Sequence, residues 1–214
     1  NKINICIKYF DKIFFESQLS YNKLMLSKFF YQCFDNYLYI LIYQLDAYVF
    51  NDKLEYWLDK NYDYIGAPWF ENYDKADFSS QLLPYAGNGG FSLRKINSFI
   101  NILNKNNFRY VYSLKELLNQ NPNKNYFKII WKRFSRKNLL FYYKKKIHED
   151  IFFAQIIPKV FSNFKVAPSE IAMHFSFEVN PEKLYTLTDN KLPFGCHAYE
   201  KYNYFFWEKF INNI

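Results

Sequence analysis

Leu38-Tyr-Ile-Leu-Ile-Tyr-Gln-Leu-Asp46 is the stretch of this sequence that decides the predicted fold. Residues 38–43 are apolar or aromatic without alternation, which is typical of a strand buried on both faces of a mixed sheet. Gln44 and Asp46 follow at the carboxyl end of this strand, where ligands bind in open α/β sheets. A carboxylate there can hold a divalent cation, and the cation can hold a diphosphate. Capping of the next turn is the alternative role for Asp46.

Helical and extended patterns alternate on both sides of this strand, so the sequence predicts an α/β fold. The expected strands are residues 3–7, 13–15, 62–66, 91–93, 166–167 and 171–177, and a polar loop is expected over 72–83. The expected helices are residues 20–34, 54–58, 95–104, 148–157 and a last one ending at 211, with Pro158 as the stop of the fourth. The length of 214 residues favours one domain.

The composition is that of a globular chain. Half of the residues are hydrophobic and 23% are aromatic, which argues against disorder. No uncharged apolar run approaches the length of a membrane helix, and no signal peptide opens the chain. Cys6, Cys33 and Cys196 lack metal-ligand spacing, so we expect free thiols in a reducing cytoplasm. Because the sequence begins with Asn1 rather than Met, we expect a piece of a longer protein.

Most of the positive charge lies in one segment, residues 109–147. This segment holds eleven basic residues and a single acidic one, Glu116, and aromatic residues are interleaved with the basic ones. Three interpretations follow: a solvated face of a helical insert, a patch that faces anionic lipid or a phosphorylated acceptor, or a binder of single-stranded nucleic acid. No recognisable RNA or DNA module accompanies the segment.

Residues 84–94 hold three of the five glycines of the chain. Glycines concentrated in this way indicate a backbone with positive φ or a ligand pressed against the chain. A tight hairpin turn is the alternative, although it needs only one or two glycines and no particular Asn.

Two further places carry polar residues that structure alone does not require. Glu149-Asp150 precedes an apolar helix, where acids suit the helix dipole but where a fold can also hold a general base rigidly. His197 follows Phe194-Gly195 and could complete a metal shell, although a lone histidine is more often a satisfied core or surface residue. His148 and His174 are interpreted as structural.

Five segments of the sequence belong together: Tyr-Gln-Leu-Asp46, Tyr64-Ile-Gly-Ala-Pro-Trp69, Gly87-Asn-Gly-Gly-Phe-Ser-Leu-Arg94, Glu149-Asp150 and Pro193-Phe-Gly-Cys-His197. Together they resemble one family, the domain-of-unknown-function family DUF5672, which looks related to glycosyltransferases of the GT-A fold. They run in order from about residue 20 to His197, and the Gly-Asn-Gly-Gly block is the most specific of them.

The resemblance implies roles for these residues. Asp46 would be the last Asp of an Asp-x-Asp motif, with Gln44 in place of the first, and together with His197 it would bind Mn²⁺ or Mg²⁺. Glu149-Asp150 is similar to the Glu-Asp pair of Fringe-like enzymes, in which the Asp is the base of an inverting transfer. The residues that would bind the donor or substrate are Gln44, Trp69, Gly87, Asn88, Gly89, Gly90 and Arg94. Tyr85 and Trp69 offer faces for sugar stacking, with core packing as the alternative for Trp69.

The expected fold is a single GT-A-like, Rossmann-like domain over residues 1–214, with a mixed, mainly parallel sheet flanked by helices and the basic insert at about 109–147. The resemblance further implies that part of the N-terminal nucleotide-binding unit is lacking. The expected function is transfer of a sugar from a nucleotide sugar, in the first place a UDP-sugar, to a glycan or glycolipid such as a growing surface polysaccharide. We expect a cytoplasmic enzyme that can lie against the inner face of the membrane. The alternatives are a non-catalytic carbohydrate-binding or assembly domain of GT-A shape, and a nucleic-acid binder.

Overall fold

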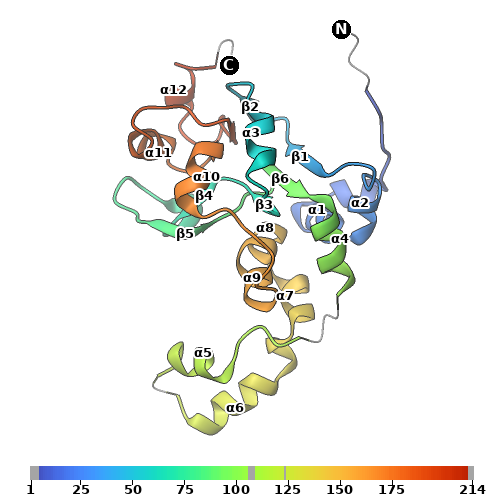
Figure 1. Cartoon of the computed structure of the whole chain (residues 1–214). Helices are drawn as coiled ribbons and strands as arrows, with labels where there is room; N and C mark the ends of the chain where they lie inside the picture. The colour runs from blue at the N-terminus through green and yellow to red at the C-terminus, as the bar shows by residue number, and fades with distance from the viewer. Residues whose placement is uncertain (1–4, 106–108, 123, 212–214) are drawn as a thin grey trace.

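The computed structural model describes residues 5–105, 109–122 and 124–211. It is a mixed α/β structure with several small sheets, none of which closes into a barrel within these ranges (Figure 1). The α/β class predicted from the sequence is therefore confirmed. Across the described residues, no helix combines the length and the apolarity that a membrane crossing requires.

The central sheet has the order β1-β6-β3, with β1 at Tyr39–Tyr43, β6 at Phe91–Lys95 and β3 at Tyr64–Ile65. The middle strand, β6, is antiparallel to both neighbours. β1 and β3 consequently run in the same direction, and their carboxyl ends meet the amino end of β6 at one edge of the sheet. This edge carries the candidate site.

β1 differs from its prediction because it lies at the border of the sheet and not in its middle. Only Ile42 is buried, and half of the Tyr43 surface is exposed. An outer strand has a neighbour on one side only, so its other hydrogen-bonding edge is left uncovered.

A second sheet has the order β2-β8-β7, and a third is a two-stranded ribbon. β2 spans Ala47–Val49, β8 Gly195–His197 and β7 Ser176–Phe177, while the ribbon joins β4, Pro68–Phe70, to β5, Leu82–Ala86. Only the β7–β8 pairing is parallel among the five strand pairings of the described residues. The expectation of a mainly parallel sheet is therefore wrong, because β6 returns between β1 and β3 in the opposite direction.

The described residues before β1 lack the predicted strands, and the helix predicted there is divided into two. Residues 5–7 form no strand, and 13–15 belong to a 3₁₀ turn, η1 at Lys12–Phe15; residues 3 and 4 lie outside the described ranges. The helix expected over 20–34 is split into α1, Gln18–Met25, and α2, Lys28–Gln32. Ser27 causes the split, since its hydroxyl accepts a hydrogen bond from the amide of Phe30 and caps α2.

The helices expected at 54–58 and 95–104 are confirmed as α3, Leu54–Asp59, and α4, Ile96–Asn104. The apolar run after His148 forms α8, Glu149–Ile151, a π-helical segment η4, Phe152–Ile156, and α9, Ile157–Val160. Pro158 does not stop this run: it occupies the first turn of α9, where its missing N–H is tolerated.

The C-terminal part contains shorter elements than expected. Residues 171–177 are not one strand, because α10, Ser169–Phe175, precedes β7. The last helix is likewise short, and residues 72–83 are not wholly loop. The remaining elements of these parts are η2, Tyr73–Lys75, α11, Pro181–Leu187, and α12, Tyr204–Trp207.

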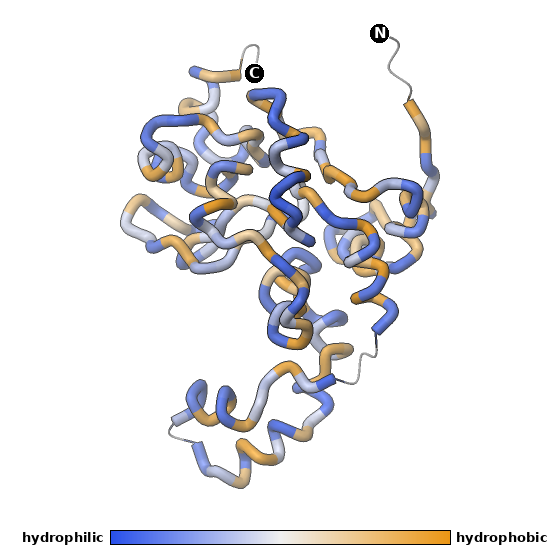
Figure 2. Tube along the Cα trace, viewed as in Figure 1, coloured by the Kyte–Doolittle hydropathy of each residue, from blue (hydrophilic) through white to orange (hydrophobic). Residues whose placement is uncertain are grey.

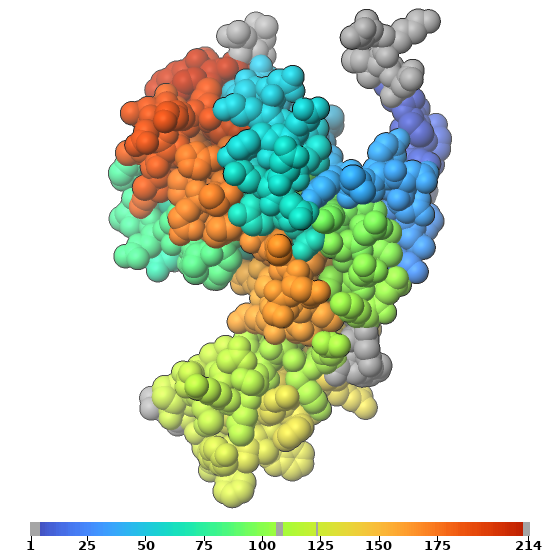
Figure 3. All heavy atoms as spheres, viewed as in Figure 1, coloured from blue at the N-terminus to red at the C-terminus, as the bar shows by residue number. Residues whose placement is uncertain are grey.

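Residues 109–147, here called the basic lobe, form short helices: α5, Leu114–Asn119, α6, Tyr126–Phe134, η3, Arg136–Asn138, and α7, Leu140–Lys146. In Figure 1, α5 and α6 hang below the rest of the molecule, whereas α7 leads back to the body and contacts η4. The lobe is closed at its stem, where the amide of Leu140 donates to the carbonyl of Arg109 at 2.8 Å and the amide of Val111 to that of Asn138 at 2.8 Å. Figure 3 shows α5 and α6 as a separate mass joined to the body through a narrow waist.

Candidate active site

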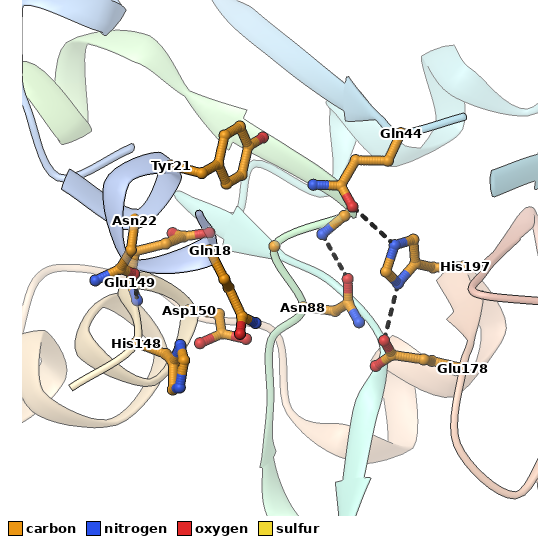
Figure 4. Close-up of a pocket in the computed structure, with 12 residues that line it drawn as sticks. Gln18, Tyr21, Asn22, Gln44, Asn88, His148, Glu149, Asp150, Glu178 and His197 are labelled. Carbon is orange, nitrogen blue, oxygen red and sulfur yellow. Dashed lines mark hydrogen bonds and ion pairs between the residues drawn. The ribbon is translucent and has the colours of Figure 1, made fainter. Parts of the chain in front are cut away.

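A polar cavity of about 220 Å³ lies where α1, the carboxyl end of β1, the loop before β6 and the start of α8 meet (Figure 4). A second cavity of about 620 Å³ shares with it Gln18, His148, Asp150, Glu178 and His197. Because five side chains face both spaces, the two cavities form one cleft, and Asp46 and Trp69 line its outer part.

His197 is the centre of one wall of this cleft. Its Nδ1 lies 2.8 Å from Oε1 of Glu178, and its Nε2 lies 3.0 Å from Oε1 of Gln44 and 3.3 Å from Oδ1 of Asp46. β8 delivers His197 opposite Ala47, one residue after Asp46, and β7 ends directly before Glu178. Strand pairing thus brings together residues that are up to 153 positions apart in the chain.

The electrostatics of this wall favour positive charge. Burial alone would lower the pKa of His197, but the hydrogen bond and charge of Glu178 and the charge of Asp46 raise it above its ordinary value. Both ring nitrogens face oxygens, so the doubly protonated ring has acceptors on both sides. A cation that replaced the proton on Nε2 would meet the same oxygens.

These residues fit a divalent metal that receives part of its shell from a substrate. Glu178 on Nδ1 would orient His197 as an outer carboxylate orients a ligating histidine, and Nε2 already faces Asp46. The described residues contain no group of three or more His, Cys, Asp or Glu side chains arranged to hold an ion. Two protein ligands suffice where phosphate oxygens and water complete the shell, as is usual for Mg²⁺.

The glycines of the loop before β6 are explained by close packing. None of the described glycines has a positive φ, so the conformational explanation offered from the sequence is wrong. A Cβ on Gly90 would fall on the imidazole of His197, and one on Gly89 would lie 2.5 Å from Oε1 of Glu149. At Gly87 it would meet the side chain of Ala154 at 2.8 Å. The groups pressed against this loop are therefore the protein's own side chains.

Asn88 holds the loop in shape. Its Oδ1 accepts hydrogen bonds from the amides of Gly90 at 2.7 Å and Phe91 at 3.2 Å, and its carbonyl accepts one from the hydroxyl of Tyr64 at 3.0 Å. No hydrogen bond of its Nδ2 occurs among the described residues, and Asn88 lines the inner cavity. The Nδ2 amide is thus the donor that this residue offers to a bound molecule.

Beneath the loop, Arg94 and Glu149 form a buried ion pair. The Nη2 of Arg94 donates to Oε1 of Glu149 at 2.9 Å and its Nη1 to Oε2 at 3.1 Å, with Arg94 wholly buried. Arg94 also donates to the hydroxyl of Tyr31 at 2.9 Å and to the carbonyl of Gly89 at 3.3 Å. The sequence predicted that Arg94 contacts the donor or substrate. Arg94 lines neither cavity, and its hydrogen bonds support the loop from beneath.

Asp150, next to this pair, faces the cleft. Its Oδ1 accepts a hydrogen bond from the amide of Ile151 at 2.7 Å. Burial and the neighbouring carboxylate of Glu149 raise the pKa of Asp150 to about 7. A carboxyl group that titrates near neutrality inside a cleft can accept a proton from a bound hydroxyl.

The structure gathers most of the predicted site residues and sets others apart. Gln44, Asn88, Gly89, Gly90, Glu149, Asp150 and His197 line the inner cavity, and Asp46 and Trp69 the outer one. Trp69 is only 6% exposed and also packs in the core beside Tyr85, with ring centroids 6.2 Å apart. Gly87 lines neither cavity.

Five residues that line the inner cavity were missed or dismissed at the level of sequence: Gln18, Tyr21, Asn22, His148 and Glu178. Glu178 could have been found, because it follows an apolar run that ends in a strand, as Asp46 does. His148 was interpreted as structural, yet it is exposed and lines both cavities. Gln18, Tyr21 and Asn22 lie on α1, and nothing in the local sequence marks them as cavity residues.

The family comparison covers nearly the whole chain, since the family described as "Protein of unknown function (DUF5672)" matches residues 4–197. A search of curated proteins found no match, and neither did a search of solved structures.

Proposed function

The chain belongs to the DUF5672 family, and we propose that it is a glycosyltransferase of GT-A-like fold that moves a sugar from a nucleotide sugar to a hydroxyl of a glycan or glycolipid. The reaction needs a base for the acceptor hydroxyl and positive charge for the leaving diphosphate. One wall of the cleft offers the base, and the opposite wall offers a place for the cation that would supply the positive charge.

The observation that carries the proposal is Asp150, a carboxyl group that faces the cleft with its pKa raised to about 7. In the proposed reaction Asp150 takes the proton of the acceptor hydroxyl as the oxygen attacks the anomeric carbon of the donor. Glu149 is held in its pair with Arg94, so its role is to position Asp150 and raise its pKa. A single base on one side of the sugar supports an inverting transfer, as the Glu-Asp resemblance implies.

The opposite wall would bind the donor. Asn88 Nδ2 and the side chain of Gln44 line the cavity and can hydrogen-bond to sugar hydroxyls. Asp46 and His197 would hold Mn²⁺ or Mg²⁺. When bound, such an ion neutralises the charge that develops on a leaving diphosphate.

The arrangement of strands supports the GT-A-like part of the proposal. β1 and β3 run in the same direction, and the residues after β1 reach the cleft at the carboxyl end of the strand, the position at which open α/β sheets bind ligands. The described residues before α1 form one 3₁₀ turn and no strand, so the proposal assigns no contact to the nucleotide base.

Calorimetric titration of UDP into this chain, with Mn²⁺ and with EDTA, tests the donor site. We expect binding that requires the metal and that is lost in Asp46→Ala and in His197→Ala. Asp59→Ala, an exposed carboxylate on α3, is the matched control and should bind as the parent does.

A screen of UDP-sugars for transfer or hydrolysis then tests catalysis. Metal-dependent binding without turnover of any nucleotide sugar would favour the non-catalytic carbohydrate-binding alternative. Absence of nucleotide binding in all conditions would contradict the donor site itself.

A further inference from the structure

Helix α6 has two apolar faces, and only one of them packs against the protein. Ile129 is buried, with 1% of its surface exposed. Phe127, Trp131 and Phe134 are 72%, 80% and 67% exposed. At about 100° per residue, these three side chains fall within roughly 60° of one another, on the side of α6 opposite Ile129. We call them the aromatic stripe.

The charges around the aromatic stripe are almost all positive. The basic lobe contains eleven basic residues and one acidic residue. Lys128 and Lys132 lie on one side of α6, between the stripe and the buried face of Ile129, and both are exposed. Figure 2 shows hydrophilic and apolar residues alternating along this helix. A partner that fits this helix must therefore have an apolar layer that can bury the aromatic side chains, together with negative charges for the lysines.

We propose that α6 docks this chain on an anionic lipid surface, with the aromatic stripe among the lipid headgroups and the lysines toward the lipid phosphates. A basic helix with aromatic residues on one face is the form that binds in the plane of a membrane interface. Its lysines gain from the negative surface potential of anionic lipids. Figures 1 and 3 show α6 on a projecting lobe, where a flat surface can reach it.

Single-stranded nucleic acid fits this geometry less well. It is bound in grooves that follow its backbone while aromatic rings stack on its bases. The aromatic stripe lies on the outward side of one projecting helix, and a solvated face alone leaves three large exposed aromatic residues without a role.

Docking of α6 has a consequence for the cleft. The basic lobe ends at residue 147, and the next three residues include His148 and Asp150 of the cleft. Docking would therefore keep the cleft close to the surface that carries a lipid-borne acceptor. This extension rests on the proposed function, whereas lipid docking itself does not.

Intrinsic fluorescence offers a direct measurement, because Trp131 is the exposed tryptophan. Trp57, Trp69 and Trp207 are 3%, 6% and 0% exposed. The full chain is mixed with vesicles of phosphatidylcholine, with or without phosphatidylglycerol. We expect a blue shift of the emission and protection from acrylamide quenching only with the anionic vesicles. Co-sedimentation with these vesicles should weaken as salt is added.

Paired variants then test the stripe. Phe127→Ala with Phe134→Ala should lower the vesicle partition coefficient about tenfold or more. The control Phe205→Ala removes an aromatic ring that is 77% exposed on α12, and it should leave binding unchanged. Lys128→Gln with Lys132→Gln should weaken binding and reduce its salt dependence, whereas Lys53→Gln with Lys75→Gln should not.

Three results would overturn the proposal. They are absence of binding to anionic vesicles, vesicle binding that is indifferent to the stripe, and stripe-dependent binding to single-stranded oligonucleotides without vesicle binding. None of these measurements uses sugar transfer, so failure of lipid docking and failure of the proposed function are separate outcomes.

Discussion

Arg94 and Glu149 are joined by two hydrogen bonds, of 2.9 Å and 3.1 Å, in the interior of the protein. Arg94 lies on β6 and Glu149 opens α8, so the pair connects the central sheet to the helix that carries Asp150. Because Arg94 also donates to the carbonyl of Gly89, one guanidinium group sets both walls of the cleft relative to each other.

Breaking this pair from one side should destabilise the protein strongly. Arg94→Met leaves a buried carboxylate without its partner, and a loss of roughly 3–5 kcal/mol in the free energy of unfolding is expected. Urea denaturation measures it, with the exposed Lys115→Met as control. The double variant Arg94→Met, Glu149→Leu should recover much of the loss, since no unpaired charge remains. A single variant that loses less than about 1 kcal/mol would argue against the pair.

Asp150→Asn should abolish most of the proposed transfer. Loss of a general base lowers the rate by about 100- to 10,000-fold. In the parent protein, kcat/KM should rise with pH up to about 7, where Asp150 loses its proton, and level off above it. Asp59→Asn is the matched control. Unchanged transfer by a folded Asp150→Asn variant would refute the assignment of the base.

The same substitution should stabilise the protein in alkaline solution. The pKa of Asp150 is raised to about 7 from an ordinary value of 3.8, so the folded state binds more protons than the unfolded state between these values. Stability therefore falls as pH rises through that window and stays low above it. Asp150→Asn removes this loss, which we place at roughly 1–3 kcal/mol at pH 8 after allowing for solvent screening.

Thermal or urea unfolding at several pH values measures the effect. The variant and the parent should unfold alike below pH 4, where Asp150 is protonated in both states of the parent. A constant difference across the whole pH range would show that the gain does not come from titration of Asp150.

Gly90→Ala should displace His197 without unfolding the protein. The added methyl group would occupy the place of the imidazole, which is the far end of a side chain that can move. Separated from Glu178, His197 should titrate nearer its ordinary pKa, and metal-dependent UDP binding should weaken. The chain has three histidines, so the proton resonances of their rings can be followed by NMR against His197→Ala. An unshifted His197 resonance would contradict the packing described.

Much of the cleft could be predicted because its residues follow strands or precede helices. Asp46 follows β1, and Asp150 lies in the first turn of α8, as the sequence pattern indicated. The glycine cluster marked the loop correctly, although the reason is contact with His197 and Glu149 and not positive φ. Local sequence indicates where such a loop lies, but not which distant side chains pack against it.

The parts that could not be predicted depend on contacts distant in sequence. The apolar run of β1 does not reveal that β6 covers one side of it only. α10 was not recognised because it is seven residues long, too short for helical spacing to stand out from the β7 strand that follows. The position of Tyr21 in the cleft depends on how α1 packs against α8, which no local pattern specifies.

The closed stem of the basic lobe makes the lobe a replaceable part. The hydrogen bond between Leu140 and Arg109 closes residues 109–140 of the lobe, so the chain enters and leaves this part at nearly one point. Evolution can lengthen, shorten or exchange such a segment without rerouting the strands and helices that hold the cleft. The proposed lipid-docking surface and the proposed reaction can therefore change independently of each other.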